Sequence, residues 1–224
     1  MKAMILAAGL GSRMRPLTEH TPKPLLEIGG IPLIVWHIER LAHDGFKDIV
    51  INIAYLGYKI AEALGDGSEW GVDITYSDEQ REGALESAGG IIKALPLLGN
   101  EPFLVVNGDI WCEYDFDPKF ELESGVLAHL ILVANPPHNL QGDFAFHDGK
   151  VLSEGSDKYT FSGIGYYHPD LFRDLPYGKQ PLAPILRDAM RDSKVSGEFF
   201  GGEWRDIGTP ERLDELNIEL FSTR

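Results

Sequence analysis

The residues best suited to chemistry lie at positions 1–26 of this 224-residue chain. An apolar run from Met4 to Ala8 gives way to a loop that contains Gly9 and Gly11. Glycine backbones can turn their N–H groups toward phosphate oxygens, a guanidinium can hold phosphate through two bonds, and an ammonium adds a compact charge. The segment holds one acid, Glu19, against a larger basic set: Lys2, Arg13, Arg15 and Lys23. In a protein of formal net charge −15, this local positive charge predicts a polyphosphate site.

Two common phosphate-binding loops do not fit this segment. The dinucleotide pattern GxGxxG needs glycine where the chain has Met14. The P-loop pattern needs Ser or Thr after Gly-Lys, whereas Val151 and Gln180 follow the Gly-Lys pairs of this chain. What stands instead is LAAGxGSRxxPLT followed by PKPL. The alternative is a turn whose basic residues are simply solvated.

Two acidic residues are placed for a metal ion. Asp109 follows the apolar run FLVVN and Gly108, and Asp206 precedes Gly208 after another short predicted strand. Mg²⁺ takes one or two carboxylates and completes its shell with phosphates and waters. The pattern therefore predicts Asp109 and Asp206 as Mg²⁺ ligands; the alternative is that each acid caps a helix or a turn.

Alternating apolar runs and amphipathic segments must position these residues. Runs such as FLVVN are typical of strands buried on both faces, and repeated strand–helix units predict a Rossmann-like doubly wound mixed α/β sheet. Ligands of such sheets bind at the carboxyl ends of the strands. The strands expected in the first half are Met4–Ala8, Asp48–Ala54, Val72–Ser77 and Phe103–Asn107. The helices expected there are Leu33–His43, Tyr55–Leu64 and Leu85–Leu95, the last one stopping before Pro96.

After about residue 110 the pattern becomes richer in strands. Asp148-Gly149 is a two-residue hairpin signal, and Thr209 and Pro210 are typical of the cap and first residue of a final helix. We expect one domain, residues 1–224, with a nucleotide-binding lobe over about 1–110 and a smaller lobe for a second substrate over about 111–224. The elements expected here are strands Val126–Ala134, Phe144–His147, Lys150–Glu154, Phe161–Tyr167, Val195–Phe200 and Glu203–Asp206, and helix Leu182–Arg191.

Composition excludes several classes of function. A net charge of −15 argues against general binding to nucleic acid, and the apolar runs fall short of the roughly 18 residues of a membrane span. The single cysteine, Cys112, excludes an intrachain disulfide, so that we expect a reducing, cytoplasmic setting. The histidines are scattered without zinc-ligand spacing. An acidic surface is compatible with a monomer, which is the expected state.

The motifs together resemble the signature of sugar-1-phosphate nucleotidylyltransferases. The resemblance rests on residues 6–13, 16–18, 22–25, 85–90, 107–109 and 204–210, and so covers nearly the whole chain. It implies a Mg²⁺-dependent transfer of UMP from UTP to a sugar 1-phosphate, with Arg13, Lys23, Asp109 and Asp206 as the catalytic set. The nucleotide-binding positions that it implies are Ala8, Gly9, Gly11, Ser12, Arg13, Lys23, Glu79, Gln80, Gly83 and Asn107.

The resemblance also implies where the sugar binds. The positions are Asn107, Gly142, Glu154, Lys158, Gly163 and Arg205. Relatives carry Lys-Pro after the glutamate, whereas Glu154 is followed by a loop that ends at Lys158. They also carry Gly-Thr-Ala-Gly where this chain has Glu86-Ser-Ala-Gly, so that either Glu79 or Gln80 could face the base.

The expected sugar is N-acetylmuramic acid 1-phosphate, which would place the protein in peptidoglycan recycling. Its lactyl carboxylate would need an arginine, for which Arg205 and Arg187 are the candidates. The alternatives are a glucose, mannose or heptose 1-phosphate, or another nucleoside triphosphate. A glycosyltransferase is a further alternative, but Arg13 and Lys23 favour a triphosphate.

Overall fold

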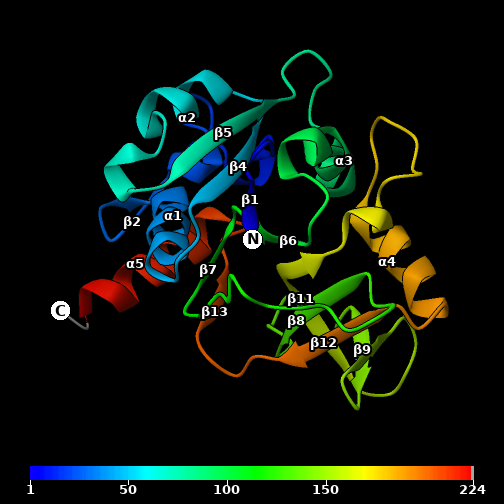
Figure 1. Ribbon diagram of the computed structural model, residues 1–224. Coiled ribbons are helices and arrows are strands. Elements are labelled where there is room, and N and C mark those ends of the chain that lie inside the picture. Colours follow the sequence, from blue (N-terminus) through cyan, green and yellow to red (C-terminus); the bar gives the residue numbers. More distant parts are fainter. Residues whose placement is uncertain (223–224) are drawn as a thin grey trace.

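The computed structural model describes residues 1–222, and its framework is one nine-stranded sheet in the order β5-β4-β1-β6-β11-β8-β12-β10-β9. Four strands of the first half run parallel: β5 (Asp73–Asp78), β4 (Asp48–Ile53), β1 (Lys2–Leu6) and β6 (Phe103–Asn107). Antiparallel β11 (Lys158–Tyr167) pairs with β6 and joins the second half to this unit. The predicted doubly wound mixed α/β fold is confirmed (Figure 1).

The second half continues the same sheet. Its further strands are β8 (Ala128–Val133), β12 (Val195–Phe199), β10 (Lys150–Leu152) and β9 (Phe144–His147). The β9–β10 hairpin turns at Asp148 and Gly149, whose φ angles of 48° and 75° are those of the predicted tight turn. β9 also pairs with β11, which closes this end of the sheet on itself.

Helices cover both faces of the parallel strands (Figure 1). Successive side chains of β1 point to opposite faces of the sheet. Ala3 and Ile5 pack against α1 (Leu33–His43) and α2 (Gly57–Leu64) on one face. Met4 packs against two other helices on the opposite face. α3 (Glu86–Leu98) and α4 (Leu182–Arg191) lie on that second face. The last helix, α5 (Pro210–Ser222), packs on a separate cluster that includes Met14 and Trp111.

Within residues 1–222, two small ladders and four short 3-10 turns complete the fold. β7 (Ile110–Cys112) pairs antiparallel with β13 (Trp204–Asp206), and β2 (Glu27–Ile28) pairs with β3 (Ile31–Pro32). The 3-10 turns are Ser12–Met14, Lys23–Leu25, Ser68–Trp70 and Pro169–Leu171. Among the described residues, no helix is both long enough and apolar enough to cross a bilayer.

The predicted end of α3 was wrong, α2 begins at Gly57 instead of Tyr55, and several strand ends differ by a few residues. α3 continues through Pro96 to Leu98 and ends at Gly99, whose φ is 94°. Proline in the last turn removes only its own N–H donor, and the turn still closes because the Gly99 N–H donates to the Leu95 carbonyl at 2.9 Å. β1 ends at Leu6 rather than Ala8 because the next N–H, of Ala7, bonds the Asn52 side chain at 2.8 Å instead of a neighbouring strand.

Candidate functional site

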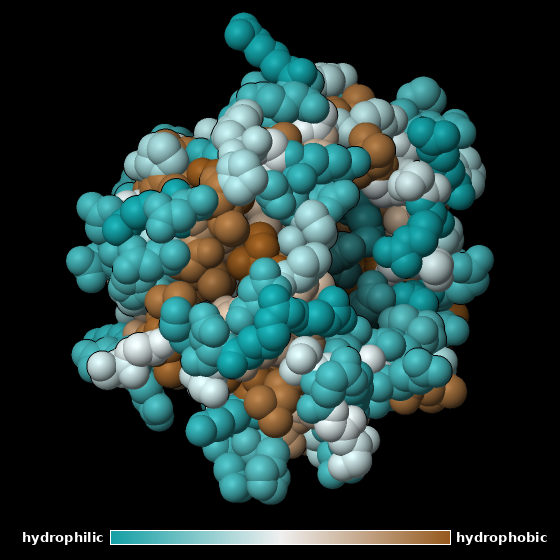
Figure 2. Space-filling model, turned by 90° about the vertical axis from the view of Figure 1, so that its right-hand side faces the viewer, coloured by the Kyte–Doolittle hydropathy of each residue, from teal (hydrophilic) through white to brown (hydrophobic). Residues whose placement is uncertain are grey.

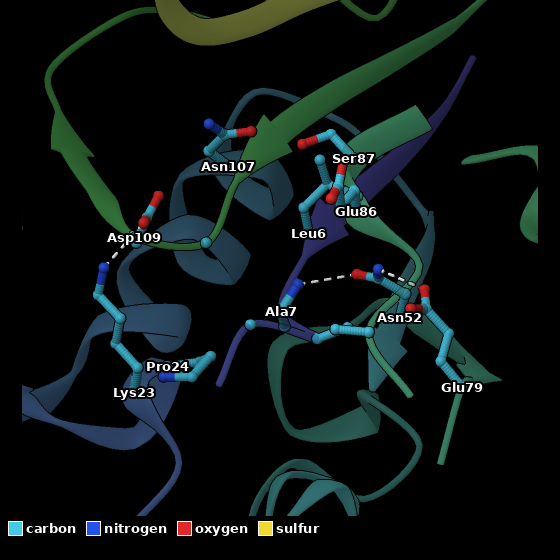
Figure 3. Close-up of a pocket in the computed structure, with 14 residues that line it drawn as sticks. Leu6, Ala7, Lys23, Pro24, Asn52, Glu79, Glu86, Ser87, Asn107 and Asp109 are labelled. Carbon is cyan, nitrogen blue, oxygen red and sulfur yellow. Dashed lines mark hydrogen bonds and ion pairs between the residues drawn. The ribbon is translucent and has the colours of Figure 1, made fainter. Parts of the chain in front are cut away.

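A pocket of about 200 Å³ opens where β1, β4, β5 and β6 end (Figure 3). This is the edge at which doubly wound sheets bind their ligands. Lys23 and Asp109 face each other on one side of the pocket, and Asn52 and Glu79 lie on the other side. The pocket is lined by Leu6, Ala7, Ala8, Gly9, Lys23, Pro24, Asn52, Glu79, Ala84, Glu86, Ser87, Asn107, Gly108 and Asp109.

The glycine loop after β1 has a fixed shape and an open surface. Gly11 has a φ of 60°, and a Cβ there would lie 3.0 Å from Cγ2 of Thr18, whose hydroxyl donates to the Gly11 carbonyl at 2.7 Å. At Gly9 a Cβ would meet nothing within 4 Å, so that a ligand can approach the backbone. The loop continues into the 3-10 turn Ser12–Met14, which places Ser12 and Arg13 next to the pocket rather than in its lining.

Lys23 brings a nearly buried positive charge to the pocket. Its side chain is 9% exposed, and its ammonium donates to Asp109 Oδ2 at 2.7 Å. A 3-10 turn that begins at Lys23, directly after Pro22, fixes the backbone from which the side chain extends. A buried ammonium is costly without a partner, so Asp109 and Lys23 hold each other in place.

Backbone pairing brings the two predicted metal ligands together. Asp206 of β13 faces Ile110 of β7, and the N–H of Ile207 donates to the carbonyl of Asp109 at 2.9 Å. The side chains of Asp109 and Asp206 are 39% and 24% exposed. Two partly exposed carboxylates, one in the turn before β7 and one at the end of β13, fit a Mg²⁺ ion that takes its other oxygens from phosphate and water. No group of three His, Cys, Asp or Glu residues that could hold a metal ion occurs in residues 1–222.

Two arginines and a histidine lie close to Asp206. Arg212 donates to Asp206 Oδ2 at 2.8 Å, and His138 Nε2 lies 3.1 Å from the same oxygen. A Cβ at Gly208 would lie 3.0 Å from Asp206 Oδ1 and 3.4 Å from an Arg13 guanidinium nitrogen. Glycine at this position therefore leaves room for Arg13 and Asp206 to approach each other, so that the first and last motifs of the chain meet.

Glu79 is buried at the other side of the pocket, where both of its carboxylate oxygens accept hydrogen bonds. Its Oε1 accepts from Asn52 at 2.7 Å and its Oε2 from the Leu85 N–H at 2.9 Å. Burial raises the pKa of Glu79, and these two hydrogen bonds partly oppose the shift. Because Asn52 also accepts from the Ala7 N–H, the network ties the loop after β1 to the start of α3. Gln80, by contrast, has an exposed side chain and does not line the pocket.

The loop between β5 and α3 is fixed by contacts with α3 and with the segment that precedes α4. Lys93 and Tyr177 both donate to Glu82 at 2.7 Å, which lowers the pKa of Glu82 to about 2. The backbone of Gln180 bonds Leu85, Ala88 and Gly89. This loop contains Gly83, which lies beside the pocket and outside its lining, and its path is fixed by the segment that leads into α4.

A second pocket of about 460 Å³ adjoins the first and shares Glu86, Ser87 and Asn107 with it. Gly163, in the bulge of β11, has a φ of 85°, and a Cβ there would lie 2.6 Å from Asn107 Nδ2. Glycine at 163 is therefore required for the position of Asn107. The other lining residues are Asp143, Phe144, Phe161, Pro181, Leu182, Ala183, Leu186 and Arg187.

Of the predicted sugar positions, Asn107 alone is in the lining of this second pocket. Glu154 and Lys158 pair with each other at 3.2 Å, and a Cβ at Gly142 would lie 2.8 Å from the backbone of Lys158. Arg205 pairs with Glu203 and Glu219 and lines a third pocket, of about 780 Å³, together with Asp206.

Sequence reasoning missed three polar residues of the lining: Asn52, Glu86 and Ser87. Asn52 gave a signal, since it is a polar residue in the apolar strand DIVINIA. Glu86 adopts a φ of 63° at the start of α3. Glutamate rarely takes this left-handed conformation, so the sequence does not predict it.

Comparisons with known proteins agree with this geometry. A family model described as nucleotidyl transferase matches residues 2–138. An N-acetylmuramate alpha-1-phosphate uridylyltransferase of Neisseria meningitidis is 54% identical over 96% of each chain, and one of Caulobacter vibrioides is 32% identical over 93% of this chain and 92% of its own. A Bacillus anthracis structure described as a glucose-1-phosphate thymidylyltransferase superposes with a TM-score of 0.85, at 25% identity over 98% of this chain and 94% of its own.

Proposed function

The chain belongs to the nucleotidyl transferase family, and on that basis we propose that it transfers UMP from UTP to N-acetylmuramic acid 1-phosphate, releasing pyrophosphate. The observation that carries the proposal is the junction of two pockets. One pocket has a glycine loop, Lys23 and Asp109, and it shares Asn107 with the other. The activities printed for the two uridylyltransferase relatives support the choice of nucleotide and sugar.

The transfer needs positioning and charge neutralisation rather than a covalent intermediate. A phosphate oxygen of the sugar phosphate attacks the α-phosphorus of UTP, and pyrophosphate leaves on the opposite side. The backbone from Gly9 to Ser12 and the guanidinium of Arg13 hold the β- and γ-phosphates. Lys23 contacts the α-phosphate and the incoming phosphate. No general base is required, because a phosphate monoester is already a nucleophile at neutral pH.

Asp109 and Asp206 would hold Mg²⁺. When bound, the ion supplies positive charge to phosphate oxygens of both substrates. Arg212 and His138 contact Asp206, and Lys23 contacts Asp109, so that these groups fix the orientation of the two carboxylates before substrate arrives. The Asn52–Glu79 network fixes the loop that follows β1.

We further propose that residues 1–110 bind the nucleotide and residues 111–224 the sugar, within one domain. The pairing of β6 with β11 supports this division, because it puts the two pockets on neighbouring strands of one sheet. We assign the protein to the cytoplasm as a monomer that acts in peptidoglycan recycling. The relatives' sugar substrate and the single thiol, Cys112, support that setting.

The test is a substrate panel that follows pyrophosphate release in the presence of Mg²⁺. UTP, dTTP, CTP and GTP are each combined with N-acetylmuramic acid 1-phosphate, glucose 1-phosphate and mannose 1-phosphate. We expect the highest kcat/KM for UTP with N-acetylmuramic acid 1-phosphate. A better nucleotide or sugar would refute that part of the proposal, and no pyrophosphate from any pair would refute the transfer itself.

A further inference from the structure

One charged group in the second pocket has no role in the transfer described above. Arg187 of α4 lines this pocket, and its Cζ lies 5.5 Å from the ring centroid of Phe144. Arg187 lines neither the pocket that holds Gly9 and Asp109 nor the pocket that holds Asp206. The guanidinium stands at the rim of the second pocket, on an exposed residue, where an incoming substrate can reach it.

Arg187 also differs from its neighbours in having no acidic partner. Within the described residues 111–222, every other arginine lies within 4.0 Å of a carboxylate oxygen: Arg173, Arg191, Arg205 and Arg212. A surface arginine in a chain of net charge −15 has many acids to choose from. An arginine left unpaired beside a pocket is therefore available for an anionic ligand.

The acidic residues that line the second pocket do not pair with Arg187 either. Asp143 is engaged, because Oδ2 accepts from the Phe161 N–H at 2.8 Å and Oδ1 accepts from Asn139 at 3.2 Å. Glu86 lies 3.8 Å from the ammonium of Lys179. The ring of Phe144 lies against the guanidinium and favours one orientation of its plane, with hydrogen-bonding edges directed away from the ring.

We propose that Arg187 determines specificity for an acidic sugar by binding the carboxylate of its lactyl substituent. The inference rests on the proposed function and assigns a residue to one part of that substrate. The phosphate end of the sugar lies toward Asn107, which both pockets share. Apolar side chains between the two ends suit the methyl group of a lactyl ether: Phe144, Phe161, Leu182 and Leu186. On the side of the molecule that carries α4, apolar patches do lie among hydrophilic residues (Figure 2).

The experiment compares two substrates and three proteins. N-Acetylmuramic acid 1-phosphate and its lactamide, in which an amide replaces the carboxylate, are each assayed with UTP. The proteins are the wild type, Arg187→Gln and the matched control Arg191→Gln. Arg191 lies one turn later on α4, pairs with Asp188 and does not line the pocket. We expect Arg187→Gln to lower kcat/KM for the acid about 10- to 100-fold through KM, because a charge-assisted hydrogen-bond pair is lost.

The lactamide distinguishes recognition of charge from damage to the fold. The wild type should prefer the acid over the amide at least about 10-fold, Arg187→Gln should prefer neither, and Arg191→Gln should match the wild type. A preference for the acid that persists in Arg187→Gln, or that is missing from the wild type, would overturn the inference. A loss of UTP affinity in Arg187→Gln would also overturn it. A wild type that transfers UMP to no sugar phosphate would instead refute the proposed function.

Discussion

Lys23 and Asp109 are held by each other as much as by the backbone. The ammonium is nearly buried and lies 2.7 Å from the carboxylate, so that the ion pair fixes the orientation of both side chains when substrate is absent. The pair presents one positive and one negative group to the same region of the pocket. This arrangement suits a reaction in which phosphate oxygens and a cation must come together at one point.

Asp109→Asn should separate the chemistry from the fold. We expect the variant to fold with a loss of about 1–3 kcal/mol, because the amide oxygen still accepts from Lys23 but no longer neutralises its charge. Mg²⁺-dependent pyrophosphate release should fall about 100- to 1,000-fold, because one carboxylate of the metal pair is lost. Asp115→Asn is the control, since Asp115 is exposed and pairs with Arg40 at the surface. Near-normal turnover by Asp109→Asn would remove Asp109 from the mechanism.

His37 makes a different residue-scale prediction, for stability against pH. It is 3% exposed, its Nε2 has no hydrogen-bond partner among the described residues, and burial lowers its pKa from 6.5 to about 4. Between these values the unfolded chain binds a proton that the folded chain does not, so stability falls as the pH falls. From pH 7 to pH 5 the contribution of His37 to the free energy of unfolding should drop by about 2 kcal/mol.

Urea unfolding of the wild type and of His37→Gln at several pH values measures this contribution. The variant has no titrating ring at position 37, and its unfolding free energy should therefore decline less between pH 7 and pH 5. Parallel curves for the two proteins would mean that His37 titrates normally in the folded state, contrary to the expected sign.

At the scale of elements, the bulge of β11 sets the position of Asn107, which both pockets share. Gly163→Ala should cost about 1–2 kcal/mol for the positive φ and should also push the Asn107 amide away. We expect kcat/KM to fall about 10-fold or more, since small displacements in an active site are costly. Gly149→Ala is a matched control, because its φ is 75° and a Cβ there meets nothing within 4 Å. Equal activity losses in both variants would show that strain, not Asn107, is responsible.

Elements with strong local signals were predicted well. α1, α4 and β6 agree with the sequence to the residue, because apolar periodicity and flanking prolines define them. The end of α3 was wrong because proline was treated as a barrier, although a last turn tolerates it. β11 begins at Lys158 instead of Phe161, because its first residues gain partners in β9, a distant strand that local patterns do not reveal.

At the scale of the whole molecule, the site depends on pairings between distant segments. The sequence indicated Asp109 and Asp206 through their motifs, but the β7–β13 ladder that brings them together has no local signal. For the same reason the polar network of Asn52 and Glu79 was not anticipated. The sugar positions Glu154 and Lys158 were predicted from the resemblance alone. In the structure these two side chains form an ion pair with each other, and neither lines the second pocket.

Charge is also distributed for function over the whole molecule. The chain carries a net charge of −15, while Arg13, Lys23 and Arg212 concentrate positive charge near the two predicted metal ligands. Only an anion that reaches this region, and carries enough charge to fill it, is favoured. A nucleoside triphosphate meets both conditions.

The fate of the sugar-phosphate oxygens tests the central claim most directly. The substrate is N-acetylmuramic acid 1-phosphate that carries ¹⁸O in its phosphate group. It is incubated with UTP, Mg²⁺ and the wild-type protein, and the masses of the products are measured by mass spectrometry. Attack of that phosphate on the α-phosphorus predicts a UDP-sugar that retains all the label and a pyrophosphate that contains none. Label in pyrophosphate or inorganic phosphate, or a UDP-sugar without label, would contradict the account.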